Sequence, residues 1–261
     1  MVVSLKNMYF KYVSEKGNVD VLQNINLNIK EGEFICVLGP SGCGKSTLLK
    51  ILAGFIKPAS GEALMDDEAI NGPDYHKGVV FQNPVLYPWL NVEDNIAFGL
   101  KMRKFPKNEI AELTKKYLEL VGLSGFGKYK PYELSGGMKQ RVSLAKTLVN
   151  KPRLILMDEP FGALDALTRN NMQKLIRKIW IKTKNTVLLI THDVDEALEL
   201  ATRIIVLSDR PGTIVKEFNT SYTYDIIKNN NENIRYSDEY MYVREEILKI
   251  INSQNNFFKV K

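Results

Sequence analysis

Short hydrophobic runs, separated by glycine-containing turns, recur along most of the chain. Alternating or continuous hydrophobic positions predict strands at residues 2–5, 21–29, 34–38, 154–157, 187–190 and 204–207. The run FICVL at 34–38 contains no polar residue, which is typical of a parallel strand buried on both faces. It stops at Gly39, and the next pattern predicts a helix over 45–53, with Gly54 directly after its end.

Hydrophobic spacing becomes helical between about residues 84 and 151. One predicted helix has hydrophobic residues at 110, 113, 117, 118 and 121, and another covers 135–149. Strand patterns then return, so we predict an α/β core divided by a helical insert. After about Phe218 the chain is rich in Asn, Lys and Tyr, and one amphipathic helix is predicted there. Its hydrophobic face consists of Tyr240, Val243, Ile247, Ile250 and Ile251.

The composition narrows the class of protein. The chain has 261 residues, of which 44% are hydrophobic and 25% charged, values typical of a globular protein rather than a disordered or fibrous one. No apolar stretch reaches the roughly 18 residues of a spanning helix, and the first residues do not resemble a secretory signal. Two cysteines fit a reducing compartment. The net charge of +6 is too small to identify a partner.

The turn after the 34–38 strand matches the phosphate-loop pattern GxxxxGK[ST]. Glycines let the backbone approach phosphate oxygens, and the following helix N-terminus favours anions. Lys45 supplies a positive charge to the β- and γ-phosphates, and Ser46 offers a hydroxyl to Mg²⁺. The predicted ATP-binding residues are Gly39, Pro40, Ser41, Gly42, Cys43, Gly44, Lys45, Ser46 and Thr47.

Each cysteine has a structural interpretation. Cys43 lies within the phosphate loop, near positive charge, where a redox-sensitive thiol is one possibility. We favour a small residue at an unconstrained position of the motif. Cys36 falls in the apolar strand and is predicted to be in the core.

Two acidic residues follow the strand at 154–157. Asp158, at the carboxyl end of this strand, is placed to reach the Mg²⁺ shell. Glu159 projects differently and is the candidate general base for a water directed at the γ-phosphate. Without the phosphate loop, the two acids would indicate no more than the start of a solvated loop.

A second anion-binding segment is LSGGMKQR, residues 134–141. The backbone N–H groups of Gly136 and Gly137, the hydroxyl of Ser135 and the helix dipole all favour an anion. One ATP needs one phosphate loop, so this second segment indicates the ATP of another molecule. We therefore predict a head-to-tail dimer with two nucleotides between the subunits. The structural alternative is that the glycines only make the N-terminus of a helix flexible and bind no anion.

The chain resembles the ATP-binding-cassette (ABC) ATPases over nearly its full length, up to about Phe218. Six motifs in the order of the family carry the resemblance: GPSGCGKST at 39–47, Gln82 in VVFQNP, LSGGMKQR, LILMDEP at 154–160, ALD at 163–165 and His192 in LLITHD. It implies an α/β fold: a P-loop NTPase (RecA-like) core with an antiparallel β subdomain and an inserted α-helical subdomain. The expected ATPase domain covers residues 1–235, with its core at about 1–84 and 152–218, the helical subdomain at about 85–151 and a helical tail at 236–261.

The resemblance also implies individual roles. Gln82 senses Mg²⁺ and the γ-phosphate, so that Mg²⁺ is held by Ser46, Gln82 and Asp158. His192 holds the γ-phosphate and the attacking water, and Asp165 bridges the two subunits. Tyr12 stacks on adenine, with Tyr9 as the alternative. Met138 departs from the commonest LSGGQ form, which matters little if backbone N–H groups bind the phosphate.

Further segments resemble the importers of nitrate, sulfonates and taurine. They are NPVLYPWLNV at 83–92, FGALDALTR at 161–169 and SDRPG at 208–212. Tyr87, Trp89 and Leu90 lie between prolines and predict a partly exposed apolar surface that receives a helix of a membrane partner, although a buried loop anchor is the alternative.

The predicted function is that of an ATP-binding and ATP-hydrolysing subunit, peripheral at the cytoplasmic face of the membrane. It is expected to energise an importer of a small organic or inorganic anion such as nitrate, a sulfonate or taurine. Its expected partners are a second copy, integral permease subunits and, indirectly, a solute-binding protein. The ATPase of an exporter, or of an importer for another solute, is the alternative. ABC ATPases that act on DNA or ribosomes carry a coiled-coil insert or two cassettes that do not fit this length, so no nucleic acid is expected. A P-loop kinase or GTPase is opposed by the segment at Ser135.

Overall fold

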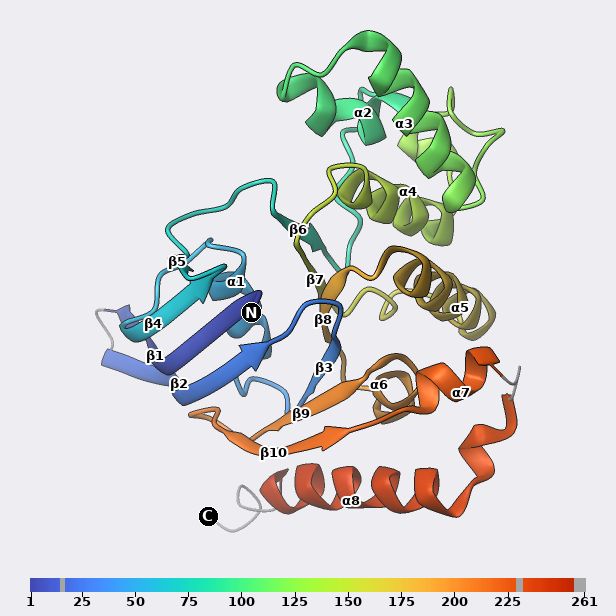
Figure 1. The fold of residues 1–261 in the computed structure, drawn as a ribbon. Coiled ribbons are helices and arrows are strands. Elements are labelled where there is room, and N and C mark those ends of the chain that lie inside the picture. The colour runs from blue at the N-terminus through green and yellow to red at the C-terminus, as the bar shows by residue number, and fades with distance from the viewer. Residues whose placement is uncertain (15–16, 229–231, 256–261) are drawn as a thin grey trace. The chain divides into compact units, whose positions relative to one another are not determined.

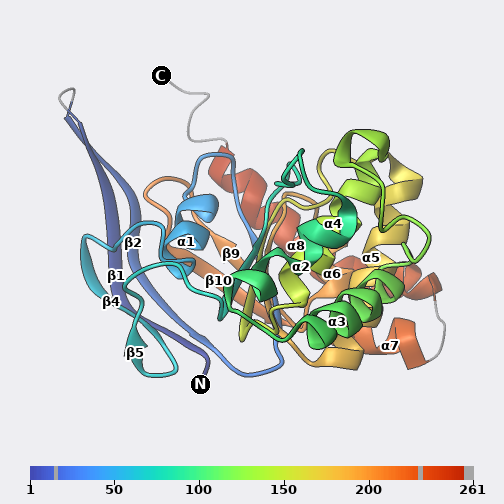
Figure 2. The same ribbon diagram turned by 90° about the horizontal axis from the view of Figure 1, so that it is seen from above.

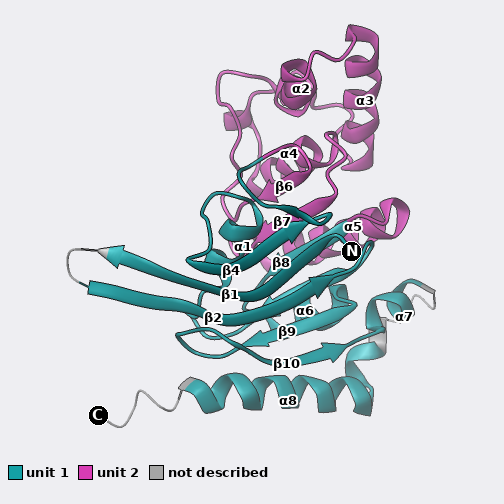
Figure 3. Ribbon diagram, turned by 60° about the vertical axis from the view of Figure 1, so that its left-hand side comes forward, with its two compact units in different colours: residues 1–73, 186–261 teal, residues 74–185 magenta. Residues whose placement is uncertain are grey.

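The computed structural model describes residues 1–14, 17–228 and 232–255, which fold into two compact units (Figure 3). Unit 1 is formed by residues 1–73 and 186–261, and unit 2 by residues 74–185. The chain therefore leaves unit 1 once and returns to it. The finer subdomain boundaries at 85 and 151 stay a prediction. None of the helices among the described residues is long and apolar enough to cross a bilayer.

An antiparallel sheet in unit 1 has the strand order β2-β1-β4-β5 (Figure 2). Its strands are β1 (Val3–Ser14), β2 (Gly17–Ile29), β4 (Ser60–Met65) and β5 (Glu68–Ala69). β1 runs well beyond the predicted residues 2–5. Its pairing with β2 shifts register between Leu5 and Met8 and again before Phe10, and each irregularity interrupts the alternation that sequence patterning detects.

The other strands of unit 1 follow the order β10-β9-β3-β8. They are β3 (Phe34–Leu38), β8 (Thr186–Ile190), β9 (Arg203–Leu207) and β10 (Ile214–Asn219). All five residues of β3 are buried, and β3 pairs in parallel with both β8 and β9. The continuous apolar pattern at 34–38 thus marks a central strand, whose carboxyl end leads into the phosphate loop and α1 (Lys45–Leu52).

Unit 2 contains two parallel strands, β6 (Lys77–Val80) and β7 (Leu154–Asp158). Its helices are α2 (Val92–Met102), α3 (Lys107–Leu120), α4 (Gly136–Leu148) and α5 (Ala166–Thr183), with a short 3-10 helix, η1, at Pro131–Glu133. Buried Val92, Ile96 and Leu100 repeat at helical spacing on α2. The predicted helices at 110–121 and 135–149 are confirmed as α3 and α4.

The last part of unit 1 is helical: α7 (Tyr222–Lys228), the 3-10 helix η2 (Glu232–Tyr236) and α8 (Asp238–Asn255) follow β10 (Figure 1). α8 packs on α6 (Val194–Leu200), which lies between β8 and β9 in the sequence. Of the predicted amphipathic face on α8, Tyr240 and Ile247 are buried, while Val243, Ile250 and Ile251 are half-buried. Tyr240 Oη donates to Asp195 Oδ1 at 3.0 Å and Arg244 Nε to the same oxygen at 2.9 Å. Residues 256–261 of the predicted tail lie outside the described residues.

Candidate ATP-binding and hydrolysis site

The phosphate loop connects β3 to α1 within unit 1. No side chain caps the N-terminus of α1, whose N-cap residue is Gly44. Gly44 has φ +107, and a Cβ there would lie 2.7 Å from Leu22 Cδ2, so both its backbone conformation and its surroundings require glycine. A helix N-terminus of this kind attracts anions through its dipole and its N–H groups. The loop therefore has the local geometry that the sequence motif predicts.

The Lys45 ammonium lies within this loop. The side chain is 8% exposed, and Nζ donates to the carbonyl oxygens of Gly39 and Pro40, both at 2.8 Å. A buried ammonium needs such partners because its desolvation is costly. The two carbonyl oxygens thus hold the Lys45 ammonium within the loop. The phosphate oxygens of a bound nucleotide would compete with these carbonyls for the ammonium.

The surroundings of Cys43 differ from the prediction, which treated it as a small residue at an unconstrained position of the motif. Its side chain is fully buried, and its Sγ is 3.8 Å from Lys45 Nζ. Burial raises the pKa of the Cys43 thiol, although the positive charge of Lys45 opposes this shift. The thiol is therefore protonated at neutral pH and is part of the packing under the loop. Cys36 is buried, as predicted.

His192 follows β8 at the same sheet edge as the phosphate loop. Val37 of β3 is paired with Ile190 of β8, so the residues that follow these two strands emerge side by side. The turn around His192 is fixed by Thr191, whose Oγ1 donates to Glu196 at 2.6 Å and accepts the N–H of Asp193 at 3.0 Å. His192 is exposed at this turn.

The two candidates for adenine stacking lie on β1. Tyr12 is 46% exposed and makes an edge contact with Phe10, with ring centroids 4.9 Å apart. Tyr9, at 37% exposure, is paired with Ser60 on β4. Both rings are accessible, so their order of preference stays a prediction.

Gln82, Asp158 and Glu159 belong to unit 2, where parallel pairing brings them to one edge. Val80 of β6 is paired with Met157 of β7, so Gln82 and Glu159 each follow the pair by two residues. A Cβ on Gly162 would lie 2.9 Å from Gln82 Nε2, which places the Gln82 side chain beside the turn after Glu159.

The backbone of Glu159 is left-handed, with φ +45. For a residue with a Cβ this conformation is strained, and such strain persists where the surrounding structure imposes it, frequently at functional sites. The different tasks expected of Glu159 and Asp158 stay a prediction.

The Ser135 segment forms the start of α4. Ser135 is the N-cap, and its Oγ accepts the N–H of Met138 at 3.3 Å. Asp165 caps α5 in the same way, accepting the N–H of Thr168 at 3.0 Å, and hydrogen bonds with Thr168 lower the pKa of this carboxyl. A Cβ on Gly137 would lie 2.5 Å from Thr168 Cγ2. The N-termini of α4 and α5 therefore meet at Gly137 and Thr168.

Comparison with known proteins identifies the family. The model of the ABC transporter family matches residues 22–162, more than half of the chain. The chain belongs to the ABC transporter family.

Relatives of this ABC ATPase match nearly end to end. The taurine import ATP-binding protein of Pelagibacter ubique (strain HTCC1062) is 48% identical over 246 residues, which cover 94% of this chain and 92% of that protein. The aliphatic sulfonates import ATP-binding protein of Bacillus cereus (strain ZK / E33L) is 42% identical over 250 residues, 95% of each.

A solved structure confirms the predicted α/β fold class. The dimeric post-hydrolysis state of the ATP-binding cassette MJ0796, bound to ADP and Pi, has a TM-score of 0.74 and 35% sequence identity. The match covers 84% of this chain and 99% of that one.

The donor chemistry of the predicted metal ligands suits Mg²⁺. Ser46, Gln82 and Asp158 offer a hydroxyl, an amide and a carboxylate oxygen, and Mg²⁺ prefers such hard oxygen donors. Within the described residues no group of three or more His, Cys, Asp or Glu side chains gathers as a metal site.

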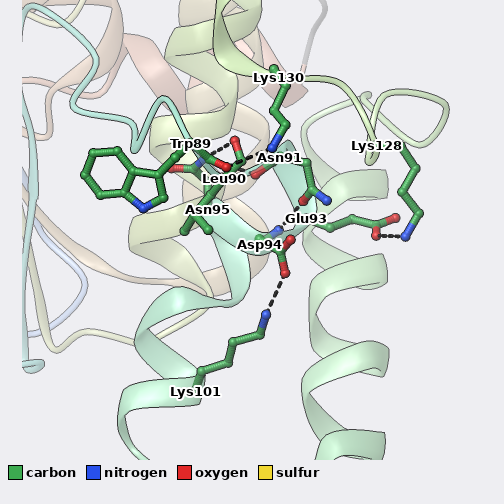
Figure 4. A network of polar contacts seen from close by, with 9 residues as sticks. All are labelled: Trp89, Leu90, Asn91, Glu93, Asp94, Asn95, Lys101, Lys128 and Lys130. Carbon is green, nitrogen blue, oxygen red and sulfur yellow. Dashed lines mark hydrogen bonds and ion pairs between the residues drawn. The ribbon is translucent and has the colours of Figure 1, made fainter.

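An exposed aromatic segment follows Gln82 in unit 2, and Figure 4 shows two of its residues, Trp89 and Leu90. Trp89 is 68% exposed, while the Tyr87 ring lies 4.5 Å from Phe98 and 5.5 Å from Trp89, centroid to centroid. Lys146 Nζ sits 4.1 Å from the centroid of the Tyr87 ring, and Lys130 Nζ donates to the carbonyl of Trp89 at 2.8 Å. The predicted apolar segment is thus held rigidly, with Trp89 facing solvent.

Asn95, on α2, supports this segment and was missed by the sequence analysis. It is fully buried on α2, and its amide donates to the carbonyls of Leu90 at 3.2 Å and Asn91 at 2.9 Å. No pattern in the sequence distinguishes Asn95 from a surface residue of an amphipathic helix, because its partners are backbone atoms of the preceding loop.

Proposed function

We propose that this ABC ATPase binds MgATP at its phosphate loop and hydrolyses it in a head-to-tail dimer that energises the import of a small anion. One observation carries the proposal: a single chain has two glycine-rich helix N-termini, those of α1 and α4. One triphosphate needs one of them, so the other serves the nucleotide of a second copy. The solved relative MJ0796, which is dimeric with ADP and Pi, supports this arrangement.

Each nucleotide in the proposed dimer contacts both copies. Residues 39–47 of one copy surround the phosphates, and Lys45 contacts the β- and γ-phosphates. Ser135, Gly136 and Gly137 of the second copy approach the γ-phosphate from the other side. Asp165 lies at this subunit boundary, and Tyr12, or alternatively Tyr9, stacks on adenine.

Hydrolysis is an in-line attack of water on the γ-phosphorus, and the bond to the bridging oxygen of ADP breaks. Glu159 orients the water and accepts its proton, while His192 and Lys45 stabilise the charge that spreads over the γ-phosphate oxygens. Gln82 senses Mg²⁺ and the γ-phosphate and couples them to the membrane partner. Bound Mg²⁺, held by Ser46, Gln82 and Asp158, supplies neutralisation of phosphate charge.

The proposed cargo is a small anion of the sulfonate type. Its support is the identity of 42–48% with ATP-binding proteins named for taurine and aliphatic sulfonates import. The chain itself contacts no cargo in this proposal. Specificity lies in a membrane permease and in a solute-binding protein that delivers the anion, and the ATPase is a peripheral subunit at the cytoplasmic face of the membrane.

The permease is proposed to dock on the aromatic segment of Tyr87 and Trp89. Exposed aromatic side chains on a rigid support are typical of interface hot spots, because they bury large apolar areas at little entropic cost. The segment follows Gln82 directly in the sequence, so a movement at the γ-phosphate reaches the docking surface through a short stretch of chain.

Substitution of Glu159 tests the proposed chemistry. Glu159→Gln keeps the size and hydrogen bonding of the side chain but removes the base, so MgATP binding is retained while turnover falls about 10²–10⁴-fold. Steady-state turnover by the assembled transporter and equilibrium binding of MgATP are the two measurements. Glu112→Gln, at an exposed position on α3, is the matched control. Turnover of Glu159→Gln near that of the wild type would exclude Glu159 as the base.

A further inference from the structure

The turn between β9 and β10 lies directly against the phosphate loop. It contains the segment SDRPG, residues 208–212, which resembles the importers but whose individual residues received no predicted role. Gly212 exchanges backbone hydrogen bonds with β2, donating to Val21 O at 2.8 Å and accepting from Gln23 N at 2.9 Å. A Cβ on Gly212 would lie 2.2 Å from the carbonyl oxygen of Cys43. The turn therefore touches the loop without an intervening side chain.

Hydrogen bonds within this turn hold it in one conformation. The hydroxyl of Ser208 accepts the N–H of Thr213 at 2.8 Å and lies 3.1 Å from the carbonyl oxygen of Pro211. The N–H of Arg210 donates to Asp209 Oδ1 at 2.7 Å. Arg210 is thus presented from a rigid support rather than from a loose loop.

Arg210 binds the phosphate loop from outside. Its guanidinium donates to the carbonyl oxygen of Gly42 twice, from Nε at 3.0 Å and from Nη2 at 2.9 Å. Two donors of a planar fork on one oxygen fix the direction of that carbonyl more firmly than a single donor does.

The direction of the Gly42 carbonyl determines that of the next N–H group. In a trans peptide the C=O and N–H bonds point to opposite sides, so a Gly42 carbonyl held outward turns the N–H of Cys43 inward. The structure shows this: the Cys43 N–H faces Pro40 O at 3.4 Å, and the same oxygen accepts from Lys45 Nζ at 2.8 Å. The Cys43 N–H and the Lys45 ammonium therefore converge on one side of the loop.

We propose that Arg210 is a positioning residue for phosphate binding: it orients the Gly42–Cys43 peptide so that the Cys43 N–H faces the phosphates of a nucleoside di- or triphosphate. Gly42 has φ +81, in the region open to glycine, and a loop built with such residues has alternative peptide orientations. Arg210 selects one of them before the ligand arrives, which removes an ordering cost from binding. The inference rests on the proposed ATP site.

The test is the affinity of the purified full-length chain for MgATP and MgADP, measured by titration calorimetry. Arg210→Ala removes both bonds, and the Kd for each nucleotide rises about tenfold, the value of one charge-assisted hydrogen bond. Arg210→Lys keeps the charge and one donor and recovers part of the affinity. The loss appears in KM for ATP rather than in kcat, because a saturating nucleotide orients the loop itself.

Two controls separate the possible causes. Lys50→Ala removes an equal charge from an exposed position on α1, without a bond to the loop, and leaves both Kd values within about twofold of the wild type. The thermal midpoint without nucleotide separates the effect on binding from a loss of folded protein. If Arg210→Ala does not fold, Arg210→Gln replaces it, and its Kd is expected to exceed that of Lys50→Ala at least about threefold.

Lys45→Ala distinguishes failure of this inference from failure of the ATP site. If Lys45→Ala loses nucleotide binding while the folded Arg210 variant binds as tightly as Lys50→Ala, the role of Arg210 is wrong and the site stands. If Lys45→Ala also binds like the wild type, the proposed ATP site itself is wrong.

Discussion

The side-chain amide of Asn95 makes hydrogen bonds with both the N–H and the carbonyl group of Tyr87. Asn95 Oδ1 accepts the Tyr87 N–H at 2.7 Å, and Asn95 Nδ2 lies 3.1 Å from the Tyr87 carbonyl oxygen. A buried residue of α2 thus fixes the loop that presents the exposed aromatic side chains. The proposed permease surface is consequently supported by a polar contact in the interior of unit 2.

Asn95→Ala is expected to lower the free energy of unfolding by about 2 kcal/mol or more, because it leaves several buried backbone groups without partners. Urea denaturation measures the change. Asn91→Ala is the matched control: it removes one cap bond to the N–H of Asp94 at 2.7 Å and costs about 1 kcal/mol. Equal losses for the two variants would show that Asn95 does no more than an ordinary cap.

The elements nearest the phosphates were predictable from the sequence. β3 and α1 follow from a continuous apolar run, a glycine motif and helical spacing, and the structure places each within a residue of its expected bounds. Parallel strands also order their carboxyl ends, so His192 and Glu159 were located from the strands before them. Such features depend on short stretches of sequence.

Other features depend on partners far away in the chain and leave no periodic signal. Arg210 and Gly42 are 168 positions apart. Cys43 is buried because the loop folds over it. The motif pattern does not specify a residue at this position, so the sequence did not predict the burial. The left-handed backbone of Glu159 likewise has no signature in residue type.

Trp89→Ala is expected to weaken docking to the permease. The large exposed indole is lost, so ATP-driven uptake in membrane vesicles falls about tenfold or more, as for an interface hot spot. The isolated subunit is expected to keep its MgATP Kd within about twofold, since Trp89 is an exposed residue of unit 2 and the phosphate loop belongs to unit 1. Met102→Ala, which also removes an exposed apolar side chain from unit 2, is the control and leaves uptake intact. Uptake at the wild-type level in Trp89→Ala would contradict the docking surface.

Gly137→Ala is expected to destabilise the protein by about 1–3 kcal/mol, because the new methyl group lies 2.5 Å from Thr168 Cγ2. Thr168→Ser removes that methyl group but retains the N–H that Asp165 caps, so the double variant recovers most of the loss. Gly136→Ala has open space around its new Cβ and is the control. Additive losses in the double variant, measured by urea denaturation, would rule out this contact.

Stability is expected to fall above about pH 8.5 through the two buried thiols. Burial raises the pKa of Cys36 and of Cys43, so the unfolded chain releases these protons at lower pH than the folded chain does. The contribution of the two protonated thiols to stability is therefore complete below their pKa in the unfolded chain. It is lost as the pH rises through their higher pKa in the folded chain. Cys36→Val removes one of the two titrations and gives a shallower alkaline decline. Parallel declines for the wild type and Cys36→Val, followed by urea denaturation from pH 7 to 10, would show that Cys36 does not contribute.

Mixing two inactive variants tests most directly whether each ATP is shared between two copies. Lys45→Ala disables the phosphate loop and Ser135→Arg disables the segment that reaches the other copy, so each variant alone is inactive. In a mixed dimer, the intact loop of the Ser135→Arg copy faces the intact segment of the Lys45→Ala copy and forms one complete site. We predict that an equimolar mixture, reconstituted with the membrane subunits, regains up to about a quarter of the wild-type ATPase rate, since half of the dimers are mixed and each has one good site. A mixture that contains verified mixed dimers but hydrolyses no faster than the separate variants would contradict the shared site.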